Sequence, residues 1–132
     1  MDAFFAVLLL VTAAGTAAYW ADFFLRGTVN VMDTDWYIRF QRAFPVADAW
    51  MSACALVGGV GLLAGSGVGV AFSLVAAGAL VFLGLMDVTF NVGNGLYRYL
   101  ATSAPMRAEL VVNVWTIGLG AALVAYLAGR VS

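Results

Sequence analysis

The sequence predicts an all-α protein: an antiparallel bundle of four transmembrane helices, with a short interfacial helix between the first and the second. Composition is the first reason, because 64% of the 132 residues are hydrophobic, 10% are charged and the mean hydropathy is +1.00. In an ordinary soluble domain roughly a quarter of the residues are charged. The second reason is four apolar runs, each about as long as the ~20 residues that a helix needs to cross a bilayer. The third is that no alternation typical of barrel strands is sustained along the chain.

The first apolar run predicts a helix over about residues 3–25, ending at Arg26 and Gly27. A cleaved secretory signal would have positive charge before a shorter apolar core. Here Asp2 precedes the run and the first Arg comes after it. We therefore expect this helix to be retained, and residues 1–132 to form a single integral membrane domain.

The second and third runs predict helices over about residues 45–65 and 68–91, with Pro45 suited to a first-turn position. Because only Ser66 and Gly67 separate them, we expect a tight antiparallel hairpin. The fourth run, about residues 105–127, follows Pro105 and is predicted to end near a glycine, Gly129.

The connection over residues 27–44 is the only long one, and it is rich in aromatic side chains. With Asp33 or Thr34 as N-cap, Trp36 and Phe40 lie four residues apart, as in a short amphipathic helix at the membrane interface. Such a helix could act as a lid, or its aromatic side chains could simply anchor the bundle at the level of the lipid headgroups.

The distribution of Arg residues predicts the orientation, because positive charge is retained on the cytoplasmic side. Five of the six Arg residues fall in the first and third connections: Arg26, Arg39, Arg42, Arg98 and Arg107. We therefore expect both termini to lie outside, in a bacterial inner membrane.

Residue types that are missing exclude several chemistries. With no His, no Lys and a single Cys, the chain lacks the usual ligands of haem and catalytic zinc, a Schiff-base amine and a redox dithiol. We expect no cofactor and no metal, and no nucleic-acid partner, because there is no basic patch. The expected partners are membrane lipid, a small amphipathic ligand, and a second copy or a partner subunit in the membrane.

Pairs of small residues four apart predict where helices pack closely, since lipid offers no hydrophobic drive for helix association. Such pairs occur on three of the predicted helices: Ala14 and Ala18, Ala55 and Gly59, and Gly118 and Ala122.

Polar side chains within the spans predict a site. Asp87 and Asn91 lie on one face of the third helix, and Glu109 and Asn113 repeat that spacing on the fourth. Asp48 belongs to the same half of an up-and-down bundle. Carboxylates and amides in a span are costly and normally face the bundle interior or a cavity. The candidate ligand-binding residues are Asp48, Asp87, Asn91, Glu109 and Asn113, with aromatic walls that include Tyr19, Trp50 and Trp115.

Asp87 is the deepest of these acids, and an unpaired carboxylate there should either bind a proton or find a cationic partner. Arg42 or Arg98 could supply that partner, in which case the polar residues would form a structural clamp between the third and fourth helices. Glu109 could likewise pair with Arg107 or Arg98.

The middle of the chain resembles small uncharacterised bacterial four-helix membrane proteins. The resemblance is carried by Phe44-Pro45, by Ala47 to Met51, by Leu83 to Val88, and by Asn91 with Asn94 to Tyr97. It covers less than half of the chain and implies a four-span bundle. It implies no activity and no catalytic role for any residue, but it places Asp48 and Asp87 in its recognisable blocks.

Three functions are compatible with this pattern. The first is a small binding or transport protein for an amphipathic or cationic molecule, because a carboxylate among aromatic rings suits an ammonium group. The second is an enzyme of isomerase or cyclase type acting on a lipid-soluble substrate, with Asp87 and either Asp48 or Glu109 as acid and base. The third is an accessory subunit of a larger membrane complex.

Overall fold

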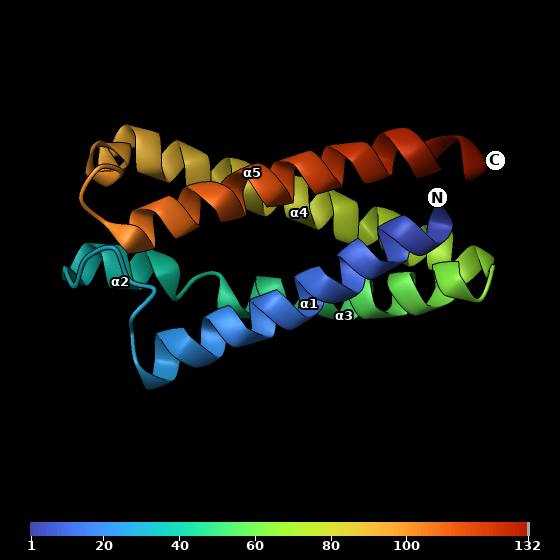
Figure 1. Ribbon diagram of the computed structural model, residues 1–132, viewed down its shortest axis with the longest axis horizontal. Helices are drawn as coiled ribbons and strands as arrows, with labels where there is room; N and C mark the ends of the chain where they lie inside the picture. Colours follow the sequence, from blue (N-terminus) through green and yellow to red (C-terminus); the bar gives the residue numbers. More distant parts are fainter. Residues whose placement is uncertain (132) are drawn as a thin grey trace.

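The computed structural model describes residues 1–131, which form an all-helical bundle (Figure 1). The helices in chain order are α1 (Asp2–Leu25), α2 (Asp35–Gln41), α3 (Pro45–Leu63), α4 (Gly67–Gly93), η1 (Leu96–Tyr99), α5 (Ala104–Leu127) and η2 (Ala128–Arg130). Within the described residues, four helical stretches are long and apolar enough to cross a membrane; one of them, Asp35–Leu63, joins α2 to α3. The predicted fold class is confirmed.

The long helices begin and end close to the expected residues. The largest differences are at the ends of α3, at Leu63 where residue 65 was expected, and of α4, at Gly93 where residue 91 was expected. Apolar runs of this length leave little choice about where a span begins and ends.

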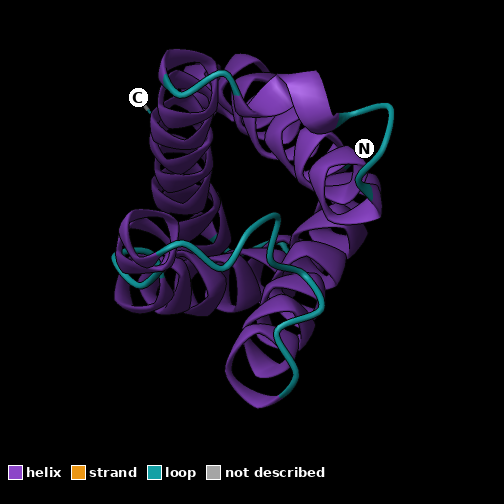
Figure 2. Cartoon of the chain, turned by 90° about the vertical axis from the view of Figure 1, so that its left-hand side faces the viewer, coloured by secondary structure: helices purple, strands orange, loops and turns teal. Residues whose placement is uncertain are grey.

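Neighbouring helices pack in the order α1, α3, α4, α5. One end of the bundle carries both termini and the turn between α3 and α4, and we call it the terminal end (Figure 1). The opposite end carries α2 and η1, and we call it the α2 end. Seen from the α2 end, the long helices surround the axis of the bundle (Figure 2). The helices α1 and α5 come first and last in this packing order. The side of the bundle between these two helices is therefore the most loosely packed.

The α3–α4 hairpin depends on glycine. A Cβ atom at Gly69 would overlap the backbone of Gly61 and Leu62, so the two helices approach to backbone contact near their turn. Ser66 caps α4 by accepting a hydrogen bond from the backbone N–H of Val68 at 3.2 Å. The expected tight hairpin is confirmed, and its closeness accounts for the small residues on both sides of the turn.

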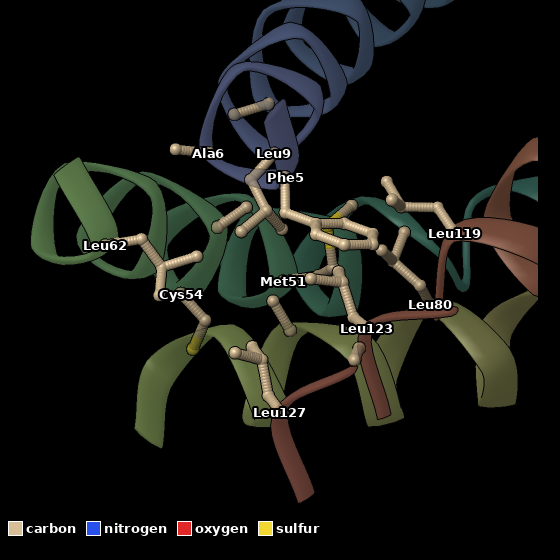
Figure 3. Close-up of a cluster of buried hydrophobic side chains, with 14 of the residues drawn as sticks. Phe5, Ala6, Leu9, Met51, Cys54, Leu62, Leu80, Leu119, Leu123 and Leu127 are labelled. Atoms are coloured by element: carbon tan, nitrogen blue, oxygen red, sulfur yellow. The ribbon is translucent and has the colours of Figure 1, made fainter. Parts of the chain in front are cut away.

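An apolar core fills the terminal half of the bundle (Figure 3). Leu9 of α1, Leu80 of α4 and Leu123 of α5 are all completely buried, and Met51 of α3 is 2% exposed. In lipid such a core favours helix association mainly through close packing. The acidic and amide residues of the candidate site lie in the other half.

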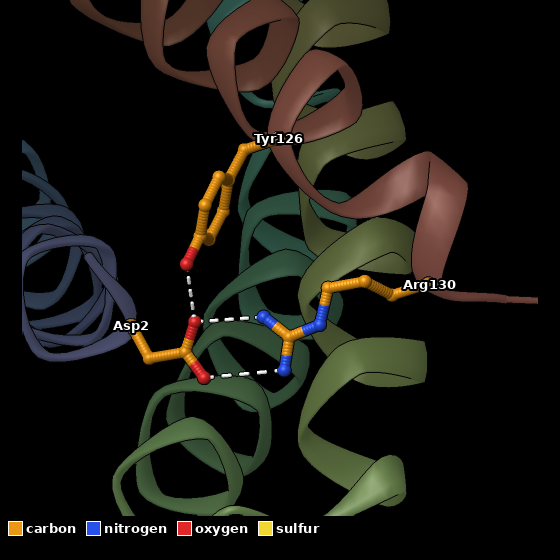
Figure 4. A network of polar contacts seen from close by, with 3 residues as sticks. All are labelled: Asp2, Tyr126 and Arg130. Atoms are coloured by element: carbon orange, nitrogen blue, oxygen red, sulfur yellow. Dashed lines mark hydrogen bonds and ion pairs between the residues drawn. The ribbon is translucent and has the colours of Figure 1, made fainter.

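The terminal end is tied by a cluster that joins α1 to the end of α5 (Figure 4). Arg130 pairs with Asp2 through two contacts of 2.7 and 3.2 Å, and the Tyr126 hydroxyl donates to the same carboxylate at 2.6 Å. This tie holds α1 and α5 together at one end only.

The small-residue pairs are confirmed on only one of the three helices. Ala55 and Gly59 are buried, and a Cβ at Gly59 would lie 3.1 Å from the Ala6 carbonyl oxygen on α1. The other two pairs are exposed, so the expectation of close packing there was wrong: Ala14 and Ala18 on α1, and Gly118 and Ala122 on α5. Spacing alone does not say whether a neighbouring helix is present.

Candidate functional site

A cavity of about 340 Å³ lies in the α2 half of the bundle and carries three carboxylates, those of Asp48, Asp87 and Glu109. They come from α3, α4 and α5 respectively, and α1 closes the remaining side. The lining residues are Val11, Thr12, Gly15, Thr16, Tyr19, Trp20, Gln41, Phe44, Asp48, Met51, Leu80, Leu83, Gly84, Asp87, Glu109, Val111, Val112, Asn113, Trp115 and Thr116. The walls are therefore mainly apolar and aromatic, with acidic groups at a few positions.

Asp87 reaches across from α4 to α5. The Asn113 side-chain N–H donates to one oxygen of Asp87 at 2.7 Å. A close approach of the helices makes this contact possible, because a Cβ at Gly84 would lie 2.6 Å from side-chain atoms of Thr116 and Ile117. The other Asp87 oxygen, Oδ1, is buried and has no hydrogen-bond partner within residues 1–131.

Glu109 is only 4% exposed, and it accepts hydrogen bonds from two neutral donors. Asn91 of α4 donates to its Oε1 at 2.7 Å, and the hydroxyl of Tyr37, on α2, donates to its Oε2 at 3.2 Å. Asn91 and Tyr37 are both completely buried. The short helix α2 is therefore part of the site and not only a membrane anchor.

Tyr97 of η1 extends this network from the α2 end. Its hydroxyl donates to Asn113 Oδ1 at 2.5 Å, and Asn91 donates to the same hydroxyl at 3.4 Å. Burial raises the pKa of Tyr97 above its ordinary range. The phenol is protonated at neutral pH and donates to Asn113 Oδ1, and this bond orients the amide so that its N–H points at Asp87.

Asp48 has a separate partner on α1. The Trp20 indole N–H donates to Asp48 Oδ2 at 2.7 Å. Asp48 is therefore held by α1, separately from the hydrogen-bond network of α4 and α5.

No cation pairs with any of the three cavity acids in the part of the chain that the structure describes. The ion pairs there are Arg26 with Asp22, Arg39 with Asp35, and Arg130 with Asp2. The expected Arg partners of Asp87 and Glu109 were wrong. Arg98 bonds the Tyr99 hydroxyl at 2.9 Å, Arg107 bonds the Leu100 carbonyl, and Arg42 is exposed. Long Arg side chains near the ends of the long helices can keep their charged groups in water, which avoids the cost of desolvation.

The expected aromatic walls are present in part. Tyr19 and Trp115 line the cavity, and the Trp115 indole N–H donates to the Thr12 hydroxyl at 2.8 Å, bridging α5 to α1. Trp50 does not line it: this side chain is 60% exposed on the outside of α3. Of the other candidates, Asp48, Asp87, Glu109 and Asn113 line the cavity, and Asn91 lies behind it as the donor to Glu109.

Sequence reasoning missed Tyr37, Gln41 and Tyr97. Gln41 lines the cavity at 4% exposure, and its Nε2 has no partner among residues 1–131. Tyr37 and Gln41 lie four residues apart on α2, as do Trp36 and Phe40, and the first pair is the one that is buried. The sequence did contain one indication: the side chains of Tyr37 and Gln41 end in polar groups, which suits the face of a helix that covers a polar cavity.

Carboxylates at this site are not arranged as a metal centre. Within the described residues there is no group of three or more His, Cys, Asp or Glu side chains that could hold a metal ion. The arrangement offers acidic oxygens, neutral donors and aromatic faces, which together can bind a positively charged group or exchange protons.

Comparisons of the chain with protein-family models, with curated proteins and with solved structures each found no match.

Proposed function

We propose that the protein binds an amphipathic small molecule with a positively charged head, which occupies the acidic cavity between α1, α3, α4 and α5. The observation that carries the proposal is the set of three cavity carboxylates whose partners are all neutral side chains. Asp48 has Trp20, Asp87 has Asn113, and Glu109 is bonded by Asn91 and Tyr37.

Charge and solvation support a cationic ligand. Carboxylates inside a membrane span are costly unless a proton or a cation compensates them. Asp87 Oδ1 is buried and without a partner in residues 1–131, so it is the oxygen best placed to accept from a ligand ammonium group. The aromatic rings of Tyr19 and Trp115 line the same cavity, and their faces attract cations.

Size and access support a small molecule that comes from the membrane. A volume of about 340 Å³ falls within the range of small-molecule sites, roughly 300 to 1,000 Å³. The walls formed by α1 and α5 are not sealed, since Val111 is 66% and Trp115 is 38% exposed. A binding protein and a transporter must both bind their ligand, so the proposal covers both kinds of protein.

We also propose that both termini lie outside a bacterial inner membrane, so that the cavity opens in the cytoplasmic half. The support is the Arg-rich α2 end, where Arg26, Arg39, Arg42, Arg98 and Arg107 all lie. Protease protection of tags placed at each terminus in oriented vesicles tests this orientation.

The binding test uses the protein in nanodiscs of zwitterionic lipid, with dodecyltrimethylammonium as the probe and dodecanol as its neutral counterpart. We expect saturable binding of the cation only, weakened at least about tenfold in Asp87→Asn, because the substitution removes a buried negative charge that attracts the head group, which itself has no N–H to donate. Asp33→Asn removes the same charge from an exposed position outside the cavity lining and is the matched control. Equal binding of cation and alcohol, or equal affinities of the two variants, would contradict the proposal.

A second candidate is an acid–base enzyme for a lipid-soluble substrate. The observation in its favour is that Asp87 and Glu109, which come from adjacent helices, line one cavity, where two carboxyl groups can serve as general acid and general base. Turnover of a polyprenoid or sterol-like compound by the purified protein, lost in Asp87→Asn, would support it over simple binding.

A further inference from the structure

We propose that Gln41 of α2 donates a hydrogen bond to a neutral oxygen of the ligand, so that the cavity selects cationic amphiphiles that carry a hydroxyl, ether or carbonyl oxygen near the charged group. The inference rests on the proposed function, because the acidic cavity binds the cation. It adds a second point of recognition and narrows the class of ligand.

The Gln41 side chain is a buried donor without an acceptor. It lines the acidic cavity and is 4% exposed, and its Nε2 has no hydrogen-bond partner within residues 1–131. Buried polar atoms of side chains normally have at least one partner, because an unmatched N–H group loses its bonds to water and gains none. A molecule that brings an acceptor into the cavity would remove this cost.

Gln41 differs in this respect from the other N–H donors of the cavity. Four side chains of the lining carry N–H groups, and three of them donate within the protein: Trp20 to Asp48 at 2.7 Å, Asn113 to Asp87 at 2.7 Å, and Trp115 to Thr12 at 2.8 Å. Among the described residues, the Gln41 amide is thus the one N–H donor of the lining that has no acceptor of its own.

The neighbours of Gln41 hold it at the cavity wall. Tyr37 lies one turn earlier on the same face of α2, and its hydroxyl donates to Glu109 at 3.2 Å. Phe44 also lines the cavity, and its backbone N–H donates to the Gln41 carbonyl oxygen at 3.1 Å. The amide is therefore positioned before any ligand binds, which lowers the entropy cost of binding.

An unmatched acceptor lies in the same cavity. Asp87 Oδ1, from α4, is buried and also has no partner within residues 1–131. Gln41 and Asp87 thus present a donor and an acceptor from different helices, and the two groups do not satisfy one another. A ligand with a cationic group for Asp87 and an oxygen for Gln41 satisfies both.

The oxygen that Gln41 binds should be neutral. Three carboxylates line the cavity, and no Arg is among its lining residues in the described part of the chain. A ligand carboxylate or phosphate would therefore be repelled. This disfavours zwitterionic lipid headgroups and favours amino alcohols, amino ethers and amino esters. Water can also accept from Gln41, but a water molecule would give no preference for a ligand that carries oxygen.

The experiment compares alkyl and ether probes of equal length in nanodiscs of zwitterionic lipid. The alkyl probe is tridecyltrimethylammonium. Three ether probes replace one methylene of its tail with oxygen, at two, three or five carbons from the nitrogen. Each affinity is corrected for partition into empty nanodiscs, so that the ratio of ether to alkyl affinity reports on the protein. In the wild type we expect at least one ether probe to bind more tightly than the alkyl probe.

Gln41→Met keeps an unbranched side chain of similar length but removes the N–H group. We expect it to lower the ether-to-alkyl ratio by about two- to tenfold, the effect of one neutral hydrogen bond, without weakening the alkyl probe. Asn94→Leu is the matched control, since it removes an exposed amide outside the cavity lining, and it should alter neither affinity. Asp87→Asn should weaken all the probes and leave the ratio unchanged, because they share the same charge.

The inference is overturned if no ether probe is preferred in the wild type, or if Gln41→Met has the same ratio as the wild type, as a purely structural residue would. The wild-type comparison needs no variant, so it is decisive even if Gln41→Met does not fold. If the wild type binds no cation, or if Asp87→Asn binds as tightly as the wild type, the proposed function itself fails. If cations bind through Asp87 with no preference for oxygen, only the role of Gln41 fails.

Discussion

Tyr37, in the middle of the short helix α2, donates its hydroxyl hydrogen bond to Glu109 of α5 at 3.2 Å, across 72 residues of sequence. This contact ties α2 to an acidic residue of the cavity and adds a polar bond to the apolar packing of α2, in which Tyr37 clusters with Leu96 and Met106. It connects the aromatic first connection of the chain to the polar interior.

Tyr37→Phe should lower the free energy of unfolding by about 1 to 3 kcal/mol, because it leaves buried Glu109 with one donor fewer. Thermal unfolding in nanodiscs measures the effect. Tyr99→Phe is the control, since the Tyr99 hydroxyl has a partner, Arg98, in an exposed position. Equal effects of the two substitutions would show that the bond to Glu109 contributes nothing.

The hydrogen bond between Trp115 and Thr12 should couple α5 to α1. In a double-mutant cycle of Trp115→Phe and Thr12→Val we expect a coupling energy of about 0.6 kcal/mol, the average for hydrogen bonds between membrane helices. Thr16→Val is the control partner, because the Thr16 hydroxyl bonds the backbone of its own helix. Coupling as large with Thr16 as with Thr12 would argue against the bridge.

Gly69→Ala should strongly destabilise the α3–α4 hairpin. The added methyl group would overlap the backbone of Gly61 and Leu62, which cannot rotate away as a side chain could. We expect a loss of about 2 kcal/mol or more, as in other overpacked contacts. Gly67→Ala, where a Cβ would meet nothing within 4 Å, should change stability by less than about 0.5 kcal/mol. If Gly69→Ala left the free energy of unfolding unchanged, α3 and α4 would have to be farther apart than described.

Stability should fall at high pH through Tyr97. Because burial raises the pKa of Tyr97, the folded protein holds the phenolic proton more tightly than the unfolded chain does. Its contribution is therefore fully present below the ordinary tyrosine pKa of about 10 and is lost as the pH rises above it. Unfolding free energies measured across this range should show a steeper decline for the wild type than for Tyr97→Phe. Identical slopes would exclude a linked proton on Tyr97.

The sequence was sufficient for the fold because each span must satisfy its backbone internally and cover the bilayer thickness. Apolar length and the Ser66–Gly67 break thus predicted the long helices and their hairpin. Which faces pack could not be predicted: Ala55 and Gly59 are buried, and Gly59 lies against α1, whereas Gly118 and Ala122, with the same spacing, are exposed.

For the site, helical periodicity placed Asp87 with Asn91 and Glu109 with Asn113, because residues four apart share a face, and the up-and-down order of the helices placed both pairs in one half of the bundle. It could not choose their partners. Arg98 has the right charge for Asp87 or Glu109 but bonds the exposed Tyr99, while a neutral phenol from α2 bonds Glu109. The fold of the first connection, which brings Tyr37 inward, and the orientation of α3, which leaves Trp50 outside, depend on tertiary packing that the short-range sequence pattern does not contain.

The most direct test of the acidic cavity is native mass spectrometry of the protein purified gently from its own membrane, with wild type, Asp87→Asn and Asp33→Asn compared. We expect the wild type and Asp33→Asn to retain a discrete small molecule with a positively charged group and an apolar tail, and Asp87→Asn to lose it. Retention of the same molecule by Asp87→Asn, or a wild type that carries no small molecule and takes up no added cation, would contradict a ligand site centred on Asp87.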